Sequence, residues 1–255
     1  MMIDGYVPHL MHRSQAGRYE KLYSRLTGNY RHIGNLLSEP RTRLIHAHFL
    51  QDGASILPLA ARRGIPLVVT AHGYDATVTV REHARRTEGL WYLALKPFLQ
   101  RYVHGVICVS QWIKQCLLEA GYPEEKLRVI PLGIDTASLP HPPSTERRRG
   151  TLFVGRLVEK KGVNYLLDAW AQLPARARSE PLTIIGDGPL MPTLVEQARQ
   201  LDIKPTFLGA RSRTEVFAAM ASHRIFAMPS IRAANGDSEG LPIVLMEAQG
   251  MGMAI

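Results

Sequence analysis

Two carboxylates near the end of the chain have the type and spacing to do chemistry. Glu239 and Glu247 stand eight positions apart, and Pro242 lies between them at the start of an apolar run. Because proline suits the first helical position, Glu239 is predicted in the loop before a helix and Glu247 five residues into it. The backbone N–H groups near Gly240 and Leu241, at the positive end of the helix dipole, favour an anion. A carboxylate on either side indicates a phosphorylated, hydroxyl-rich ligand.

A basic pair precedes these carboxylates. Arg156 and Lys161 lie in the loop between a predicted strand over 151–155 and a helix that begins near Val163. Loops that follow the strands of an open α/β sheet meet at the edge where such sheets bind ligands. The planar fork of arginine and the point charge of lysine suit a diphosphate. Taken alone, the same residues also fit a solvated turn.

Two more loops follow predicted strands. In Gly186-Asp-Gly-Pro189, Gly186 and Gly188 allow close backbone approach and positive φ, although such a sequence alone is more often a tight turn. His72 comes directly after a strand and before Gly73, where it could donate a hydrogen bond to a sugar hydroxyl or leaving oxygen. A lone histidine is usually structural, so both interpretations of His72 stay open. The irregular stretch 231–239 is long enough to be a binding loop.

Other patterns argue against other kinds of site. His46 and His48 share one face of a strand, but with no carboxylate or cysteine nearby in the sequence, packing or an acceptor contact is favoured over a metal. Ser110 lacks the G-x-S-x-G frame of a hydrolase, and no G-x-G-x-x-G motif follows a strand, which weighs against a dinucleotide oxidoreductase. Cys108 and Cys116 give neither a disulfide framework nor metal-ligand spacing, which fits a reducing cytoplasm.

Short apolar strands alternate with helices along the chain, and this pattern predicts parallel sheets covered on both faces. Residues 140–150 are rich in proline and charge and are predicted to be a linker. The expected fold class is therefore α/β, with two similar units over 1–139 and 151–255. Residues 15–38 fit two helices separated at Gly28. Strands are expected at 44–48, 66–71, 105–110, 127–131, 151–155, 182–186, 206–209 and 225–229.

Composition limits the partners. The chain has 255 residues, 45% of them hydrophobic, and a net charge of +9 from 31 basic and 22 acidic residues. This is an ordinary globular composition with enough apolar residues for two domains. Runs such as 147–149 are usually solvated, and a nucleic acid partner is not expected. The aromatic, amphipathic segment 90–102 fits core packing, or alternatively peripheral contact with a bilayer. No stretch reaches the roughly 18 apolar residues of a membrane span.

Taken together, the motifs resemble retaining glycosyltransferases of the GT-B fold, of the family 4 type (glycosyl transferases group 1) that includes bacterial polysaccharide and lipopolysaccharide sugar transferases. They occur in the family's order from about residue 43 to the end. The irregular loop before Glu239 is most similar to exopolysaccharide-type members. The motifs are His46-Ala-His48, Thr70-Ala-His-Gly-Tyr-Asp75, Val109-Ser110, Val129-Ile-Pro-Leu-Gly-Ile-Asp135, Val154-Gly-Arg156 through Lys161-Gly162, Ile185-Gly-Asp-Gly-Pro189, Phe207-Leu-Gly209, Met228-Pro-Ser230 and Glu239-x7-Glu247.

The resemblance implies two Rossmann-like domains, an acceptor-side domain over 1–139 and a domain over 151–255 that binds a nucleotide-diphosphate sugar. It implies transfer of the sugar from a UDP- or GDP-sugar to a glycan or lipid-linked acceptor, with retention at the anomeric carbon and no metal. Retention through a covalent intermediate and through front-face attack both stay open. A cytoplasmic protein, at the inner face of the plasma membrane, is expected.

The resemblance also implies roles for individual residues. Arg156 and Lys161 would neutralise the diphosphate and so ease its departure. Glu247 would accept the ribose hydroxyls, and Glu239 would hold the donor sugar. His72 would contact that sugar from the other domain and stabilise its oxocarbenium-like state. The catalytic residues expected are thus His72, Glu239, Arg156 and Lys161, and the donor-binding residues expected are Arg156, Lys161, Gly186, Gly188, Gly240, Leu241 and Glu247.

The two ends of the chain depart from the family pattern. The family opens with a strand and a glycine-rich loop, which nothing before residue 42 matches, and residues 250–255 look like the start of a further strand. We therefore expect an internal fragment with two incomplete domains. Two other functions remain open from the sequence: a catalytically inactive nucleotide-sugar-binding fragment or partner subunit, and a GT-B sugar-nucleotide epimerase.

Overall fold

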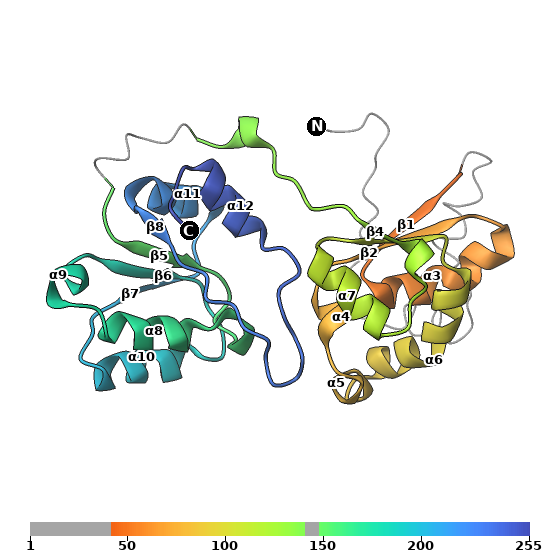
Figure 1. Ribbon diagram of the computed structural model, residues 1–255, viewed down its shortest axis with the longest axis horizontal. Helices are drawn as coiled ribbons and strands as arrows, with labels where there is room; N and C mark the ends of the chain where they lie inside the picture. Colours follow the sequence, from red (N-terminus) through yellow and green to blue (C-terminus); the bar gives the residue numbers. More distant parts are fainter. Residues whose placement is uncertain (1–41, 141–147) are drawn as a thin grey trace, which may run out of the picture. The chain divides into compact units, whose positions relative to one another are not determined.

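The computed structural model describes residues 42–140 and 148–255 (Figure 1). The helices predicted over 15–38, and most of the predicted linker, lie outside these residues. In the described part the predicted strands are all present, and most strand and helix bounds fall within a few residues of the expected ones. The short helices α4 (Tyr74–Thr77), α5 (Val80–Ala84) and α9 (Ala175–Arg178) were not predicted, because four or five residues are too few to show helical periodicity.

The chain divides into two compact units. The first unit holds the described residues up to Ala71 together with His83–Ile107 and Gly121–Arg128. The second unit holds His72–Glu82, Cys108–Ala120 and Val129–Ile255. The boundaries expected from the sequence, on either side of residues 140–150, stay a prediction. His72, which the resemblance assigned to the other domain, belongs to the same compact unit as Lys161 and Glu239.

The first sheet has the strand order β1-β2-β3-β4. Its strands are β1 (Ile45–His48), β2 (Leu67–Ala71), β3 (Gly105–Cys108) and β4 (Leu127–Val129). β1 and β2 are parallel and in register from Ile45 with Leu67 to His48 with Thr70. Parallel neighbours need a crossover, and α3 (Leu50–Arg63) provides it. α3 ends at Gly64, whose φ of 62° is left-handed and therefore favours glycine.

The predicted amphipathic segment forms α6 (Thr87–Tyr102), which packs against α3. It buries Tyr92 and Leu99, and it leaves Leu90, Phe98 and Tyr102 exposed in the described structure. The packing face expected from the sequence is therefore present. Contact of the exposed residues with a bilayer stays a prediction. None of the helices in the described ranges is long and apolar enough to cross a membrane.

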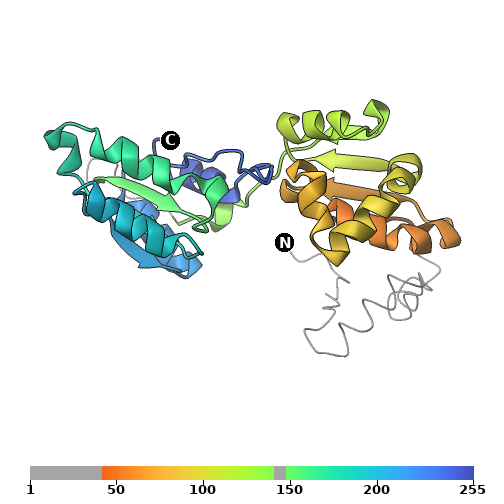
Figure 2. The same ribbon diagram turned by 90° about the horizontal axis from the view of Figure 1, so that it is seen from below.

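The second sheet is parallel, with the order β7-β6-β5-β8. Its strands are β5 (Thr151–Val154), β6 (Leu182–Ile185), β7 (Thr206–Gly209) and β8 (Ile225–Phe226). Figures 1 and 2 show α8 (Val163–Ala171) and α10 (Met191–Gln200) together on one face, and Figure 1 shows α11 (Arg213–Ser222) and α12 (Ile243–Gly250) on the other. Ala254 forms a parallel bridge with Ile225, in agreement with the strand start predicted there.

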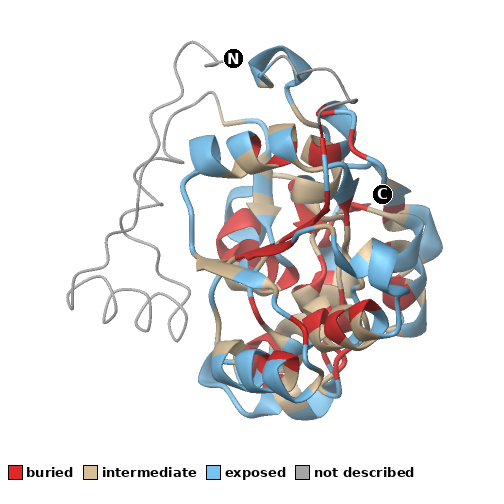
Figure 3. Ribbon diagram, turned by 90° about the vertical axis from the view of Figure 1, so that its left-hand side faces the viewer, coloured by how far each residue is buried: buried red, intermediate tan, exposed pale blue. Residues whose placement is uncertain are grey.

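Each face of this sheet carries its own apolar core. Successive residues of a strand point to opposite faces, so Phe153 packs with Leu167 of α8 while Leu152 packs with Met220 of α11 and with Ala248 of α12. All five are completely buried. Figure 3 shows the buried residues concentrated in the strands and on the inner sides of the helices. The sheet is thus a rigid base for the loops at its edge.

Replacing Leu167 by alanine tests the core under α8. Leu167 is 0% exposed, so Leu167→Ala should lower the free energy of unfolding by about 2–5 kcal/mol through lost burial and the cavity left behind. Val195→Ala on α10 removes a side chain that is 47% exposed, and it should change that free energy by less than about 0.5 kcal/mol. Urea unfolding of both variants measures the difference, and equal losses would contradict the assigned core.

Candidate functional site

Three loops meet at the carboxyl edge of the second sheet, after β5, β6 and β8. The β6 loop packs closely on the β5 loop at two glycines. Gly186 has φ 138°, and a Cβ there would lie 1.8 Å from the Gly155 oxygen; a Cβ on Gly188 would lie 2.4 Å from the Leu157 oxygen. Only glycine fits at either position without displacing backbone. The two predicted glycines therefore hold the loops together at this edge.

The β5 loop ends in a 3-10 turn, η4 (Glu159–Lys161), which adjoins the loop that follows β8. Gly162 has φ 64°, and a Cβ there would lie 2.0 Å from the Pro229 oxygen. The Ile231 N–H donates to the Lys160 carbonyl at 2.9 Å, and the Ala234 N–H donates to Glu159 Oε1 at 2.9 Å. We call residues 231–241 the donor loop, after the donor-site role that the resemblance implies for Glu239. The turn carrying the lysines thus anchors the donor loop at its start.

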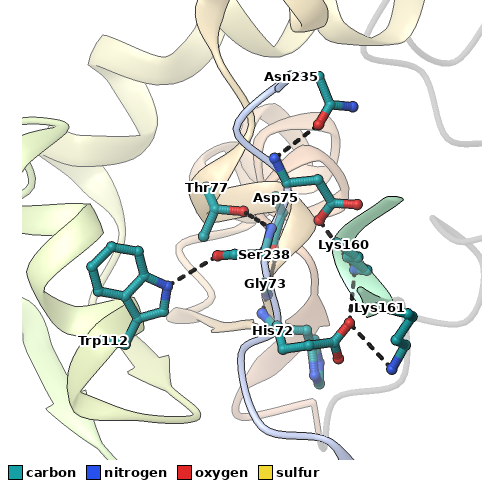
Figure 4. A network of polar contacts seen from close by, with 11 residues as sticks. His72, Gly73, Asp75, Thr77, Trp112, Lys160, Lys161, Asn235 and Ser238 are labelled. Atoms are coloured by element: carbon teal, nitrogen blue, oxygen red, sulfur yellow. Dashed lines mark hydrogen bonds and ion pairs between the residues drawn. The ribbon is translucent and has the colours of Figure 1, made fainter. Parts of the chain in front are cut away.

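Two lysines and two carboxylates form a compact charge cluster between this turn and the donor loop (Figure 4). Lys161 Nζ lies 3.2 Å from Glu239 Oε1. Lys160 Nζ lies 3.4 Å from the same oxygen and 3.1 Å from Asp237 Oδ1. The four side chains are only 13% to 20% exposed, so water screens these pairs less than at an open surface. Glu239 Oε1 is buried and meets the lysines as ion pairs without hydrogen-bond geometry.

Ser238, between the two carboxylates, is fixed from two sides. Its N–H donates to Thr77 Oγ1 at 3.1 Å, and its Oγ accepts from Trp112 Nε1 at 3.0 Å (Figure 4). The Asp237 N–H donates to Asn235 Oδ1 at 2.9 Å, which stabilises the preceding turn. With Ser238 only 6% exposed, the donor loop has little freedom at this point. Asp237 and Glu239 therefore project from a fixed backbone.

His72 lies in a turn that the buried carboxylate of Asp75 organises. Asp75 Oδ1 accepts the N–H groups of His72 and Gly73, each at 3.0 Å, and Asp75 is 2% exposed. Gly240 packs directly on this turn, because a Cβ at residue 240 would lie 1.9 Å from the His72 carbonyl oxygen. The structure thus brings the backbone of the His72 turn beside the donor loop, and the role of the His72 side chain stays a prediction.

Glu247 is the fifth residue of α12, as predicted, but Pro242 is the residue before the helix and not its first residue. The ψ of Pro242, 116°, is extended, whereas its φ of −71° suits both the first helical residue and the residue before it. The expected helix start is therefore corrected by one position. Glu247 Oε1 pairs with Arg213 Nη2 of α11 at 3.3 Å, and the Arg213 guanidinium lies 5.1 Å from the centre of the Phe217 ring. Glu247 is not part of the lysine cluster.

The predicted residues therefore fall into a connected group, the two glycines of the β6 loop, and two separate members, Arg156 and Glu247. Lys161, Glu239, Gly240 and His72 are linked by direct contacts, and Leu241 follows in the same loop. Arg156 is exposed beside the glycine loops, and within the described ranges its side chain has neither a hydrogen bond nor an ion pair. It is available to a ligand at the sheet edge.

The paired histidines of β1 lie outside this group. Their rings stack, with centroids 4.8 Å apart, and His46 Nε2 lies 2.7 Å from Thr70 Oγ1. Burial, and secondarily the neighbouring His48, lower the pKa of His46 below its ordinary value. This is the packing arrangement favoured from the sequence. The described residues contain no cluster of three His, Cys, Asp or Glu side chains placed to hold a metal.

Several residues of the site were not singled out from the sequence: Lys160, Asp237, Ser238, Thr77, Trp112 and Asp75. Two of them carried a local signal. Lys160 stands next to Lys161, and Asp237 stands two residues before Glu239 in the predicted binding loop. The hydrogen bonds of Ser238 with Thr77 and Trp112 join residues more than a hundred positions apart, and no local pattern indicates such contacts.

Comparison with protein families decides what kind of protein carries this site. Residues 7–138 match Glycosyltransferase Family 4, and residues 148–255 match Glycosyl transferases group 1. The chain belongs to glycosyltransferase family 4. Its α/β architecture is the Rossmann-like GT-B fold that the motifs implied, and the family assignment from the sequence is confirmed.

Curated relatives agree with the family. WcaL of Escherichia coli (strain K12), named for a glycosyltransferase of colanic acid biosynthesis, is 35% identical over 146 residues, which are 54% of this chain and 35% of WcaL. A GDP-mannose-dependent alpha-(1-6)-phosphatidylinositol monomannoside mannosyltransferase of Mycolicibacterium smegmatis is 30% identical over 212 residues, 78% of this chain and 53% of that protein. The chain thus spans about a third to a half of these relatives.

Solved structures show the same fold. Anabaena Alr3699/HepE in complex with UDP and glucose superposes with a TM-score of 0.68 at 21% identity, covering 90% of this chain and 62% of that one. The lipopolysaccharide outer core galactosyltransferase WaaB superposes with a TM-score of 0.61 at 17% identity, covering 93% of this chain and 60% of that one. At these identities the likeness concerns the fold.

Substitution of Gly240 tests the packing of the donor loop on the His72 turn. Gly240→Ala should lower the free energy of unfolding by about 1–3 kcal/mol, because the added methyl overlaps the His72 carbonyl. It should also change the near-ultraviolet circular dichroism, because Ser238 would shift at Trp112. Gly133→Ala is the control, since a Cβ there meets nothing within 4 Å. A Gly240→Ala variant that behaves like Gly133→Ala would contradict the packing.

Proposed function

We propose that this protein transfers a sugar from a UDP- or GDP-sugar to a glycan or lipid-linked acceptor, with retention of the anomeric configuration. The observation that carries the proposal is the convergence, at one sheet edge, of Lys161, Arg156, the two close-packed glycine turns and the start of α12 with Glu239 before it. Cations, backbone N–H groups and a carboxylate then lie at the same edge of the sheet. That combination suits a diphosphate joined to a polyol.

The proposed chemistry is stabilisation of the leaving group. As the bond from the anomeric carbon to the diphosphate oxygen breaks, negative charge grows on that oxygen. Arg156 and Lys161 would neutralise it, and the N–H groups of Gly240 and Leu241 would add the field of the helix start. These groups would neutralise the negative charge that a divalent cation neutralises in metal-dependent enzymes. We therefore propose that transfer needs no metal.

The remaining residues hold the two ends of the donor. Glu239 would accept hydroxyls of the transferred sugar, and His72 would contact that sugar and stabilise its oxocarbenium-like state. Glu247 would accept the ribose hydroxyls in place of its present contact with Arg213. The names of two curated relatives, for colanic acid and amylovoran biosynthesis, support a role in bacterial polysaccharide synthesis. That this role is carried out at the cytoplasmic face of the membrane is part of the proposal. Both donor bases stay in the proposal, because relatives that use GDP-mannose and structures with bound UDP are similar to this chain.

The direct test is turnover of nucleotide sugars. The purified protein would be incubated with UDP-glucose, UDP-galactose and GDP-mannose, and released UDP or GDP would be measured with and without a glycan acceptor. Release of nucleotide diphosphate, with the new linkage keeping the donor's anomeric configuration, is expected. Binding without release would favour an inactive sugar-nucleotide-binding protein, and interconversion of donors without release would indicate an epimerase; either result contradicts transfer.

The Arg156→Ala variant tests whether Arg156 contacts the phosphates of the nucleotide or its base. Loss of one charge-assisted contact should weaken binding of UDP or GDP about tenfold or more and leave binding of the free nucleoside unchanged. Arg176→Ala, at an exposed position of α9, is the matched control and should change neither. Calorimetric titration gives both affinities. Equal weakening of nucleoside and nucleotide would remove the phosphate role of Arg156.

The two glutamates should have separable effects. Glu247→Ala should weaken nucleotide binding about tenfold, because a charged acceptor for two hydroxyls is lost. Glu239→Ala should leave nucleotide affinity near that of the wild type and reduce turnover. Glu196→Ala, on the exposed side of α10, serves as the control. Unchanged nucleotide affinity in the Glu247 variant would exclude its ribose role.

A further inference from the structure

Lys160 occupies a different place in the charge cluster from its neighbour Lys161. Lys161 contacts a single carboxylate, Glu239, at 3.2 Å. Lys160 contacts two, Asp237 at 3.1 Å and Glu239 at 3.4 Å, and it therefore bridges the two residues on either side of Ser238. Its backbone carbonyl also accepts the Ile231 N–H at the start of the donor loop. Lys160 is thus the residue of the turn most closely bound to the donor loop.

The positive and negative charges of the cluster are equal in number. Two ammonium groups face two carboxylates, and Glu239 Oε1 is shared by both lysines while itself buried. A diphosphate carries more negative charge than one carboxylate, so an arriving donor would draw Lys161 away from Glu239. A partly buried carboxylate that loses its counter-ion is strongly destabilised. Glu239 would then be held only if a second cation stayed with it.

We propose that Lys160 is a positioning residue that keeps Asp237 and Glu239 in place while Lys161 turns to the donor diphosphate. The inference rests on the proposed function, since it assigns different tasks to two adjacent lysines at the same donor site. Lys161 is the cation that changes partner, and Lys160 is the cation that stays. Ser238, seated on Thr77 and Trp112, keeps the backbone between the two carboxylates fixed during that exchange.

This division of tasks predicts a specific kinetic pattern. Lys160→Met keeps most of the side-chain length and removes the charge. Nucleotide affinity should stay within about twofold of the wild type, while kcat for sugar transfer should fall about tenfold or more, because Glu239 is no longer oriented toward the sugar. Lys161→Met should instead weaken nucleotide binding. Lys160→Arg keeps the cation and should restore most of kcat. Lys204→Met, at an exposed lysine of the same unit, is the matched control.

The experiment measures UDP and GDP affinity by calorimetry, and kcat and KM for the donor that the protein turns over. Because Lys160→Met also removes a contact of the fold, Asp237→Asn breaks the same ion pair from the other side and must show the same split, with the thermal midpoint recorded for each variant. An unchanged kcat in both variants overturns the proposal, as does a joint fall of affinity and kcat like that of Lys161→Met. If the wild type neither binds nor turns over any donor, the proposed function itself fails, and the positioning role fails with it.

Discussion

The parallel pairing of β5 with β6 and β8 is the constraint on which the site depends. Strands that run the same way end at the same edge, so the three loops that follow them must meet there. Two cores, one on each face of the sheet, hold these strands in place. The loops come into contact through glycines, because any side chain at Gly162, Gly186 or Gly188 would overlap a neighbouring backbone. Close backbone packing at these glycines therefore positions the loops that carry the candidate site residues, independently of the charges on those residues.

Charge then fixes the donor loop on this base. Lys160 and Lys161 neutralise Asp237 and Glu239 over distances of 3.1 to 3.4 Å, in a place that is mostly shielded from water. Ser238 adds two hydrogen bonds, and Gly240 lies against the His72 turn. In the proposed function Lys161, one of these two lysines, also contacts the diphosphate of the donor. The positive and negative charges of this cluster are thus equal in number, and binding of the proposed donor would change their pairing.

Much of this could be predicted from the sequence, because the signals were local. Apolar strands, each followed by a loop with glycine or charge, placed Lys161, Gly186 and Glu239 at one edge, and the order of the motifs indicated the family. The contacts of Ser238 with Thr77 and Trp112 could not be predicted, since they depend on the path of the whole chain. Nor could the different partners of Lys160 and Lys161, because adjacent side chains in a 3-10 turn diverge and only the fold decides which carboxylates they meet. The helix predicted to start at Pro242 starts one residue later, because the φ of proline suits both the first helical residue and the residue before it.

In the proposed function a diphosphate binds between Arg156, Lys161 and the start of α12. A crystal structure of the protein with UDP or GDP, whichever binds more tightly, tests it most directly. Phosphate oxygens are expected within hydrogen-bond distance of both cations, with Lys161 moved off Glu239 and Lys160 still paired with Asp237. A diphosphate bound elsewhere, or one bound while Lys161 keeps its contact with Glu239, would contradict it.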